Sequence, residues 1–417
     1  MTISARDKDI LRELASKVAV IGGLPVQTEK AELWRRLNQL EPVRPLVWFN
    51  DICWYELNVD DELTLQTADE WAREQEQQLR QTIYWWKHMP GDMVVDDYLS
   101  CPLVIRSSGL GIDEKVDIAR TDEKSGIVSR HFHRQIFEPE DIDKIKMPKV
   151  TYDEAATEAN YQRMCEVFGQ IMPVSKVGQK IGGFAPWDEL IRWWGVEEAL
   201  MDLIARPEMV TAIVSHLVDA YLCDLDQLEE LNLLSPNNDN IRIASGGYGY
   251  TDELPGEDFE PEHVRTRNMW GGATAQIFSE VSPEMHWEFA LKHELRWLER
   301  WGLTYYGCCE PLDGKMALMR RIPNLRKISM SPWINVDRAV AEVGADYVFS
   351  YKPNPAILAE DKWQPARARD ELGRVLERAQ QCRVEVIMKD ISTVRYEPQR
   401  LWDWEKMAME LAEEFGC

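Results

Sequence analysis

Leu303-Thr-Tyr-Tyr-Gly-Cys-Cys-Glu-Pro-Leu312 is a short apolar run that ends at a glycine and leads into reactive side chains. The first four residues have the β-prone composition of a buried strand. The thiols of Cys308 and Cys309 and the carboxylate of Glu310 then follow at the carboxyl end of that strand. Active sites of barrels built from alternating strands and helices lie at these ends. We therefore expect the chemistry of the protein here.

The sequence on both sides repeats the order of strand, polar strand end and helix. Each expected strand is short and apolar, and a helical pattern follows most of them. The expected strands are 46–49, 180–184, 241–244, 303–306, 327–330, 347–350 and 384–388. This alternation predicts an α/β fold with a parallel sheet, and the polar strand ends favour a (β/α)8 TIM barrel.

Three parts of the chain depart from the barrel pattern. Residues 1–41 predict an N-terminal helical extension, so the barrel is expected over 42–417. An insertion at about 96–137 alternates short runs with Gly-rich and Asp-rich turns, which predicts a β-hairpin. A second insertion at about 245–267 is long enough for a lid or an inserted subdomain. His131 and His133 in the hairpin have metal-ligand spacing, but no nearby thiol or carboxylate completes a set, so we interpret them as surface residues.

Composition restricts the class of partner. The chain has 417 residues and a formal net charge of -24, from 72 acidic and 48 basic residues. Such a charge argues against nucleic acid or an anionic membrane as the main partner. No signal peptide pattern and no run of eighteen apolar residues is present, so no membrane span is expected. The eight cysteines are scattered, which indicates free thiols and a cytoplasmic location.

Other polar side chains follow the expected strands and would converge with the cysteines on one face of a barrel. Asp51, Lys389 and Asp390 are candidates for acid–base catalysis. The more common role for such a residue as Asp51 is a turn or helix-capping carboxylate. The candidates for substrate binding are Trp48, Asn50, Gln276, Tyr306, Trp333, Lys352 and Asn354.

The adjacent cysteines restrict any metal site. Two neighbouring thiols would form a strained chelate ring, and the cysteines of structural zinc sites normally stand two or more residues apart. One thiol with a carboxylate fits better, so Cys308 and Glu310 are the candidate metal ligands. The alternative for Cys308 is a buried, inert cysteine.

Several segments match a known pattern. They are Trp270-Gly…Gln276, Ser282-Pro-Glu-Met285 with the following helix, and the strand that ends in Gly-Cys. Pro353-Asn-Pro-Ala-Ile-Leu358 is similar to an Asn-x-x-Pro-x-x-Leu segment, and a final strand, a proline and a closing helix also fit. Together they resemble the uroporphyrinogen decarboxylase superfamily over most of the chain from about Pro42. The resemblance implies a (β/α)8 barrel with N-terminal additions.

This superfamily has two chemistries: porphyrinogen decarboxylation without a cofactor, and zinc-dependent methyl transfer to or from a corrinoid protein. The decarboxylases carry an arginine-rich signature after the first strand. Here Trp48-Phe-Asn-Asp-Ile-Cys-Trp-Tyr-Glu56 has no arginine and two acids, which would repel a substrate with many carboxylates.

The methyltransferases place His-x-Cys after one strand and a further cysteine after the last. Here Tyr306-Gly-Cys308 and Lys389-Asp-Ile-Ser-Thr393 stand at those places, so Cys308 matches. Glu310 or Asp390 would have to complete a zinc site, because carboxylate oxygen also suits zinc.

The leading hypothesis is a methyltransferase that moves a methyl group between a small methylated substrate and a corrinoid-binding protein. The resemblance implies zinc as the Lewis acid, and an aryl ether or an amine as the substrate. One alternative is a cofactor-free decarboxylase with Asp51 or Asp390 as the acid–base group. The other is a non-catalytic barrel that binds a tetrapyrrole or a partner protein. The sequence leaves a homodimer open.

Overall fold

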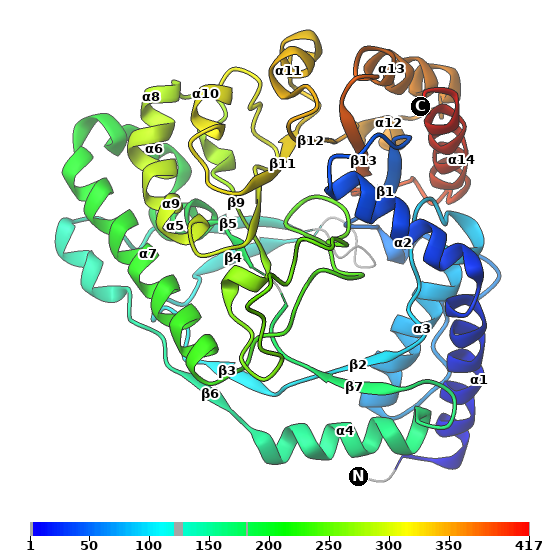
Figure 1. Ribbon diagram of the computed structural model, residues 1–417. Helices are drawn as coiled ribbons and strands as arrows, with labels where there is room; N and C mark the ends of the chain where they lie inside the picture. The colour runs from blue at the N-terminus through cyan, green and yellow to red at the C-terminus, as the bar shows by residue number, and fades with distance from the viewer. Residues whose placement is uncertain (1–2, 121–127, 181, 417) are drawn as a thin grey trace.

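The computed structural model describes residues 3–120, 128–180 and 182–416. The protein is a mixed α/β molecule with a central parallel sheet (Figure 1). In the described residues this sheet has seven strands, in the order β1-β13-β12-β11-β10-β9-β8. They are β1 (Leu46–Phe49), β8 (Gly183–Phe184), β9 (Trp270–Ala273), β10 (Leu303–Tyr306), β11 (Leu325–Met330), β12 (Val348–Tyr351) and β13 (Arg383–Met388).

Helices connect the strands from β9 to β13 and on to the end of the chain. Parallel neighbours need such crossovers, and helices on the sheet leave its strands buried. All residues of β1, β9, β10 and β12 are buried accordingly. The helices are α8 (Pro283–His286), α9 (Lys292–Leu298), α10 (Met316–Met319), α11 (Val336–Val343), α12 (Ala356–Ala359), α13 (Pro365–Arg378) and α14 (Gln399–Glu414), with a π-helical turn at Trp287–Leu291.

A ring of eight strands was expected. In the described part of the chain the sheet has seven strands and two edges. Its edge strands are β1 and β8. A separate parallel pair joins β2 (Leu99–Pro102) to β7 (Val174–Val177), and β7 lies shortly before β8 in the chain. The segment that leads to β2 reaches β1 through the Asp92 N–H, which donates to the Val47 carbonyl at 2.8 Å.

One strand prediction is wrong, and one strand of the sheet was not predicted. Residues 241–244 do not form a sheet strand, and Arg242 makes an isolated bridge to Tyr248. The backbone of this segment instead turns back on itself: the Ile243 N–H donates to the Gly247 carbonyl and the Gly249 N–H to the Ile241 carbonyl, both at 3.0 Å. Conversely, β9 forms although it contains two glycines. The Trp301 ring packs so closely that a Cβ on Gly271 would lie 2.2 Å from it.

The N-terminal part of the molecule is helical, as expected. Helices α1 (Ala5–Gly22), α2 (Pro25–Asn38), α3 (Glu70–His88) and α4 (Glu154–Phe168) are found there or pack against it. Ser4 caps α1 by accepting from the Asp7 N–H at 3.0 Å. Leu11 and Leu14 of α1 are buried in a core shared with α3 and α4.

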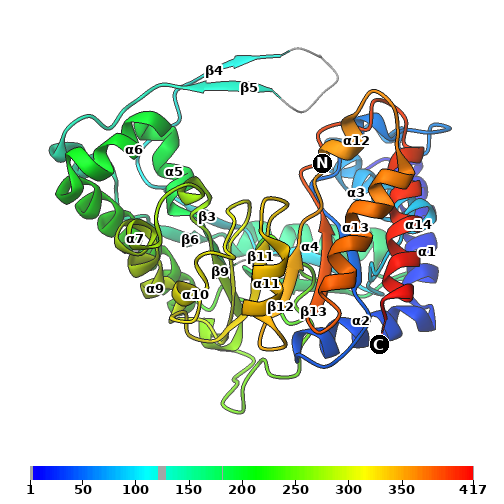
Figure 2. The same cartoon turned by 90° about the horizontal axis from the view of Figure 1, so that it is seen from above.

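A second helical group, α5 (Pro186–Trp194), α6 (Val196–Ala205) and α7 (Pro207–Glu230), lies beside β8 and β9 and has its own apolar core. Before it, β3 (Ile105–Ser107) pairs antiparallel with β6 (Val150–Tyr152). The hairpin expected in the first insertion is present as β4 (Val116–Ala119) and β5 (Ser129–Phe132), and it stands off from the body (Figure 2). His131 and His133 are exposed, and His133 pairs with Asp117 at 3.0 Å.

The second insertion packs against the molecule. Asn38 donates to the carbonyls of Tyr248 and Tyr250, and Glu253 pairs with Arg326 at the amino end of β11. These contacts place residues 248–253 near the amino ends of the strands, while the Ser245 hydroxyl at the start of the insertion donates to the Gly307 carbonyl at 3.0 Å. None of the helices in the described ranges combines the length and apolar character that a membrane span requires.

Candidate active site

A cavity of about 490 Å³ lies at the carboxyl ends of β8, β9, β10 and β13. Strand ends, helix α5 and the irregular segment after residue 240 supply its walls. Its polar lining combines a thiol, carboxylates, cations and hydroxyls. Those side chains are Asp188, Glu189, Arg192, Tyr221, Arg242, Ser245, Thr274, Cys308 and Lys389.

The turn after β10 brings Cys308 to the cavity wall. Gly307 has φ +97°, and a Cβ there would lie 2.5 Å from Leu312 and 3.0 Å from the Ser329 Cβ. The Ser329 hydroxyl donates to the Cys308 carbonyl at 2.6 Å. A glycine is therefore required at 307, and the buried strand β11 fixes the backbone of the cysteine that follows.

Cys308 lies against a lysine. The Lys389 ammonium donates to Cys308 Sγ at 3.2 Å and contacts the Asp390 carboxylate at 3.0 Å. Cys309 Sγ lies 3.6 Å from Cys308 Sγ. The hydrogen bond from Cys309 and the charge of Lys389, acting against burial and Glu310, lower the pKa of Cys308 to about 6. The neighbours of Cys308 therefore favour its thiolate form.

The protons of this cluster lie on the neighbours of Cys308. The hydrogen bond to Cys308, together with burial, raises the pKa of the Cys309 thiol. Burial opposes the charge of Lys389, but Cys308 and Asp390 outweigh it and raise the pKa of Lys389. The arrangement therefore pairs a nucleophilic thiolate with a protonated lysine at the cavity wall.

The opposite wall is acidic and aromatic. Gln276 Nε2 donates to Asp188 Oδ2 at 2.7 Å, while the buried Asp188 Oδ1 has no hydrogen-bond partner among the described residues. Burial raises the pKa of both Asp188 and Glu189. The rings of Phe184 and Tyr221 meet edge to face at 5.0 Å beside them. A buried carboxylate oxygen without a partner leaves room for a donor or a cation from a ligand.

Three non-glycine residues with left-handed backbone lie at this end of the sheet. Asp51, Ala244 and Asp390 have φ of 48°, 48° and 56°. Asp51 is exposed and pairs with Arg242 at 3.5 Å, and its N–H donates to Asn50 Oδ1 at 2.9 Å. Strained backbone of this kind is concentrated at functional sites.

The donor set does not fit the expected zinc. The buried Glu310 carboxylate already accepts from the Thr274 hydroxyl at 2.9 Å, the Ala275 N–H at 3.3 Å and the Cys308 N–H at 2.8 Å. Among the described residues, no group of three or more histidine, cysteine, aspartate or glutamate side chains has a metal-binding arrangement. The Lys389 ammonium lies 3.2 Å from Cys308 Sγ, so a metal cation on this sulfur would be close to a like charge. We derive no step through zinc.

Three predicted substrate-binding residues lie inside the protein, away from the cavity lining. Tyr306 faces the helices, where its hydroxyl donates to Glu294 at 2.7 Å. Lys352 is buried and donates to Ser350 Oγ at 2.7 Å, and burial lowers its pKa to about 7. Trp48 stacks on Trp85 with ring centroids 5.8 Å apart.

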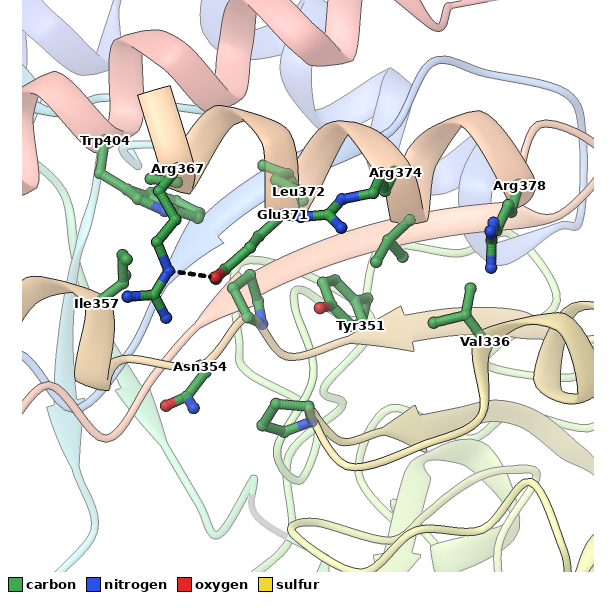
Figure 3. A pocket seen from close by; sticks show the side chains of 14 residues that line it. Val336, Tyr351, Asn354, Ile357, Arg367, Glu371, Leu372, Arg374, Arg378 and Trp404 are labelled. Carbon is green, nitrogen blue, oxygen red and sulfur yellow. Dashed lines mark hydrogen bonds and ion pairs between the residues drawn. The ribbon is translucent and has the colours of Figure 1, made fainter. Parts of the chain in front are cut away.

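Trp333 and Asn354 lie elsewhere on the molecule. Asn354 lines a different groove, of about 430 Å³, between α13 and the segments after β11 and β12 (Figure 3). Arg367, Arg374 and Arg378 of α13 also line that groove. Trp333 has 68% of its surface exposed. The structure thus brings together Cys308 and Lys389 at the cavity, with Asp390 paired to Lys389 and Gln276 bonded to the cavity residue Asp188.

Comparison with protein-family models finds no match, and neither does comparison with curated proteins. Among solved structures, a methyltransferase from Methanosarcina mazei matches with a TM-score of 0.50 and 10% sequence identity. The match covers 93% of this chain and 98% of that chain. The likeness is one of fold. It extends over nearly all of both chains, so the architecture described above is shared as a whole.

The sequence analysis did not identify the cavity residues Asp188, Glu189 and Arg242. Asp188 and Glu189 follow Pro186 at the start of α5, directly after β8. Applying the strand-end rule to β8 would have found both. Arg242 was missed because residues 241–244 were expected to be a buried strand. Thr274 was missed because the glycines of β9 hid the strand that it follows.

Proposed function

We propose that this protein is a methyltransferase whose reactive group is the Cys308 thiolate. The observation that carries the proposal is the 3.2 Å contact between Lys389 Nζ and Cys308 Sγ on the wall of a ligand-sized cavity. The fold neighbour is a methyltransferase, and this and the resemblance found in the sequence support methyl as the transferred group. A barrel-like scaffold, with the β2–β7 pair continuing the ring toward β1, is part of this proposal.

The thiolate would act as the nucleophile. The Cys308 sulfur forms a bond to the methyl carbon, and the bond from that carbon to the substrate heteroatom breaks. The electron pair of the broken bond stays on the heteroatom. Lys389 holds the sulfur as a thiolate before the step and can protonate an anionic leaving group after it.

The cavity favours a methylated amine over an aryl ether. Asp188 and Glu189 lie beside the rings of Phe184 and Tyr221, and Asp188 Oδ1 lacks a partner among the described residues. Carboxylates and aromatic faces together attract a methylated ammonium group. An uncharged aryl ether would leave the buried Asp188 Oδ1 atom without a hydrogen-bond donor or a cation beside it.

A corrinoid-binding protein remains the proposed partner that accepts or supplies the methyl group. Zinc is not used in this proposal, because the Glu310 carboxylate already accepts hydrogen bonds from three donors, the Thr274 hydroxyl and the N–H groups of Ala275 and Cys308. The alternative decarboxylase, with Asp51 or Asp390 as the acid–base group, has no specific support, because both carboxylates are exposed and paired with cations.

Demethylation with a chemical acceptor tests the proposal. The protein is incubated with reduced free cobalamin as the acceptor and with either tetramethylammonium or anisole as the donor. Nuclear magnetic resonance then follows the loss of methyl from each donor. We expect the ammonium donor to be demethylated faster than anisole.

Variants show whether the demethylation takes place at this cavity or independently of it. Cys308→Ala should abolish the reaction, and Asp188→Asn should slow it with the ammonium donor by about tenfold, the effect of losing one charged contact. Cys223→Ala, a partly buried cysteine of α7, is the control and should be unchanged. Full activity in Cys308→Ala would refute the proposal.

A further inference from the structure

The two adjacent thiols at the cavity are arranged for oxidation as a pair. We propose that a hydroperoxide oxidises Cys308 and that Cys309 then closes a reversible disulfide with it. This is a modification site, and it does not depend on the identity of the transferred group. It rests on the position of two sulfur atoms and one ammonium group.

The geometry supplies both partners of such a reaction. The two sulfur atoms lie 3.6 Å apart, and Lys389 Nζ lies 3.2 Å from the sulfur of Cys308. The ammonium stabilises Cys308 as the thiolate, the form that attacks a peroxide oxygen. Cys309 is exposed, so its sulfur can move without disturbing the core. A reactive thiol beside a second cysteine is the usual arrangement of reversible thiol oxidation.

The reaction balances in two steps. The Cys308 sulfur forms a bond to one peroxide oxygen, the O–O bond breaks, and the leaving oxygen takes a proton from Lys389 or water. Cys308 is then a sulfenic acid. The Cys309 sulfur next attacks the Cys308 sulfur, the S–O bond breaks, and the oxygen leaves as water with the Cys309 proton. Two thiols are oxidised and one peroxide is reduced.

The disulfide should be easily reversed. Adjacent Cα atoms are about 3.8 Å apart, below the range of about 4.4–6.8 Å that is usual for disulfides. A bond formed at this separation is strained, and strained disulfides are readily reduced by thiols. Oxidation would thus remove the nucleophile at the cavity wall, and a thiol reductant would restore it.

Mass spectrometry of the intact chain tests the inference. The reduced protein is treated with one equivalent of hydrogen peroxide and then digested. We expect the chain to lose the mass of two hydrogens, with the change confined to the peptide that contains both cysteines. Dithiothreitol should restore the mass and the alkylation of Cys308 by iodoacetamide.

Two variants make the result specific. Cys309→Ala should gain the mass of one or more oxygens on Cys308 in place of the hydrogen loss, because no resolving thiol is present. Cys223→Ala should behave as the parent protein. Gain of oxygen without loss of hydrogen in the parent would overturn the inference, and so would hydrogen loss in Cys309→Ala. Both readings are independent of methyl transfer, so the two proposals can fail separately.

Discussion

The charge on Cys308 is set by its immediate neighbours. Cys309 donates a hydrogen bond, Lys389 adds a positive charge, and together they lower the pKa of the thiol to about 6 from the ordinary value of 9.0. Because the folded thiol ionises at lower pH, its reactivity should rise through about pH 6 and then level off.

Lys389→Met should raise the pKa of Cys308. If the pKa moves to about 8, the thiolate fraction at pH 7 falls about tenfold, and alkylation slows accordingly. The pH profile of iodoacetamide labelling at Cys308, read by peptide mass, measures this shift. Lys406→Met, at an exposed position of α14, is the matched control. Superimposable profiles for Lys389→Met and the parent would show that the contact does not act on the thiol.

At the scale of elements, three neighbouring strands carry a polar layer on their interior face. Lys327 of β11 and Glu385 of β13 form a fully buried ion pair at 2.9 Å, and Ser350 of β12 donates to Glu385 at 2.6 Å. Strands of a parallel sheet that is covered on both faces are usually apolar. The stability of this polar layer therefore requires that each of its buried polar groups is hydrogen-bonded or ion-paired.

Lys327→Met should destabilise the fold by about 3–5 kcal/mol, because it leaves the Glu385 charge buried without a counter-ion. Urea unfolding, monitored by circular dichroism, gives the difference in the free energy of unfolding between the variant and the parent. The double variant Lys327→Met/Glu385→Gln removes both charges and should recover part of the loss. A single variant within about 1 kcal/mol of the parent would show that the pair does not support the sheet.

The contact between α9 and β10 should make stability depend on pH. Burial raises the pKa of Glu294 from 4.5 to about 8. The folded state therefore holds this proton more tightly than the unfolded chain. The resulting stabilisation is complete below about pH 4 and is lost as the pH rises through about 8.

Glu294→Gln keeps an acceptor for Tyr306 and removes the titration. Between about pH 5 and pH 8, its melting temperature should fall by a few degrees less than that of the parent. Thermal unfolding across this range is the measurement. Glu288→Gln, an exposed residue with a partner at Lys292, is the control. Equal slopes for Glu294→Gln and the parent would contradict the assignment.

Element identity was largely readable from the sequence. Ser282-Pro-Glu predicted the start of α8, and Ser282 does accept from the Met285 N–H at 3.3 Å. It was harder to predict to which side of the sheet a single side chain points. Successive strand residues point to opposite sides. Tyr305 therefore faces the interior, where its hydroxyl donates to Ser350, while Tyr306 faces the helices.

At the scale of the whole molecule, the sequence placed Cys308 and Lys389 at strand ends but did not show how these ends meet. Cys308 and Lys389 were predicted to converge on one face, because both follow parallel strands of one sheet. In the structure their side chains are in contact. The groove that contains Asn354 could not be foreseen, because it depends on the packing of α13 over the segments after β11 and β12. The cavity wall at Asp188 likewise depends on where α5 docks.

The central claim is that Cys308 meets the transferred methyl group. The most direct test is the mass of the peptide that contains Cys308 after incubation with deuterated tetramethylammonium and no acceptor. The account predicts one deuterated methyl group on Cys308 in the parent protein and far less in Lys389→Met. Demethylated product without label on Cys308 would contradict it.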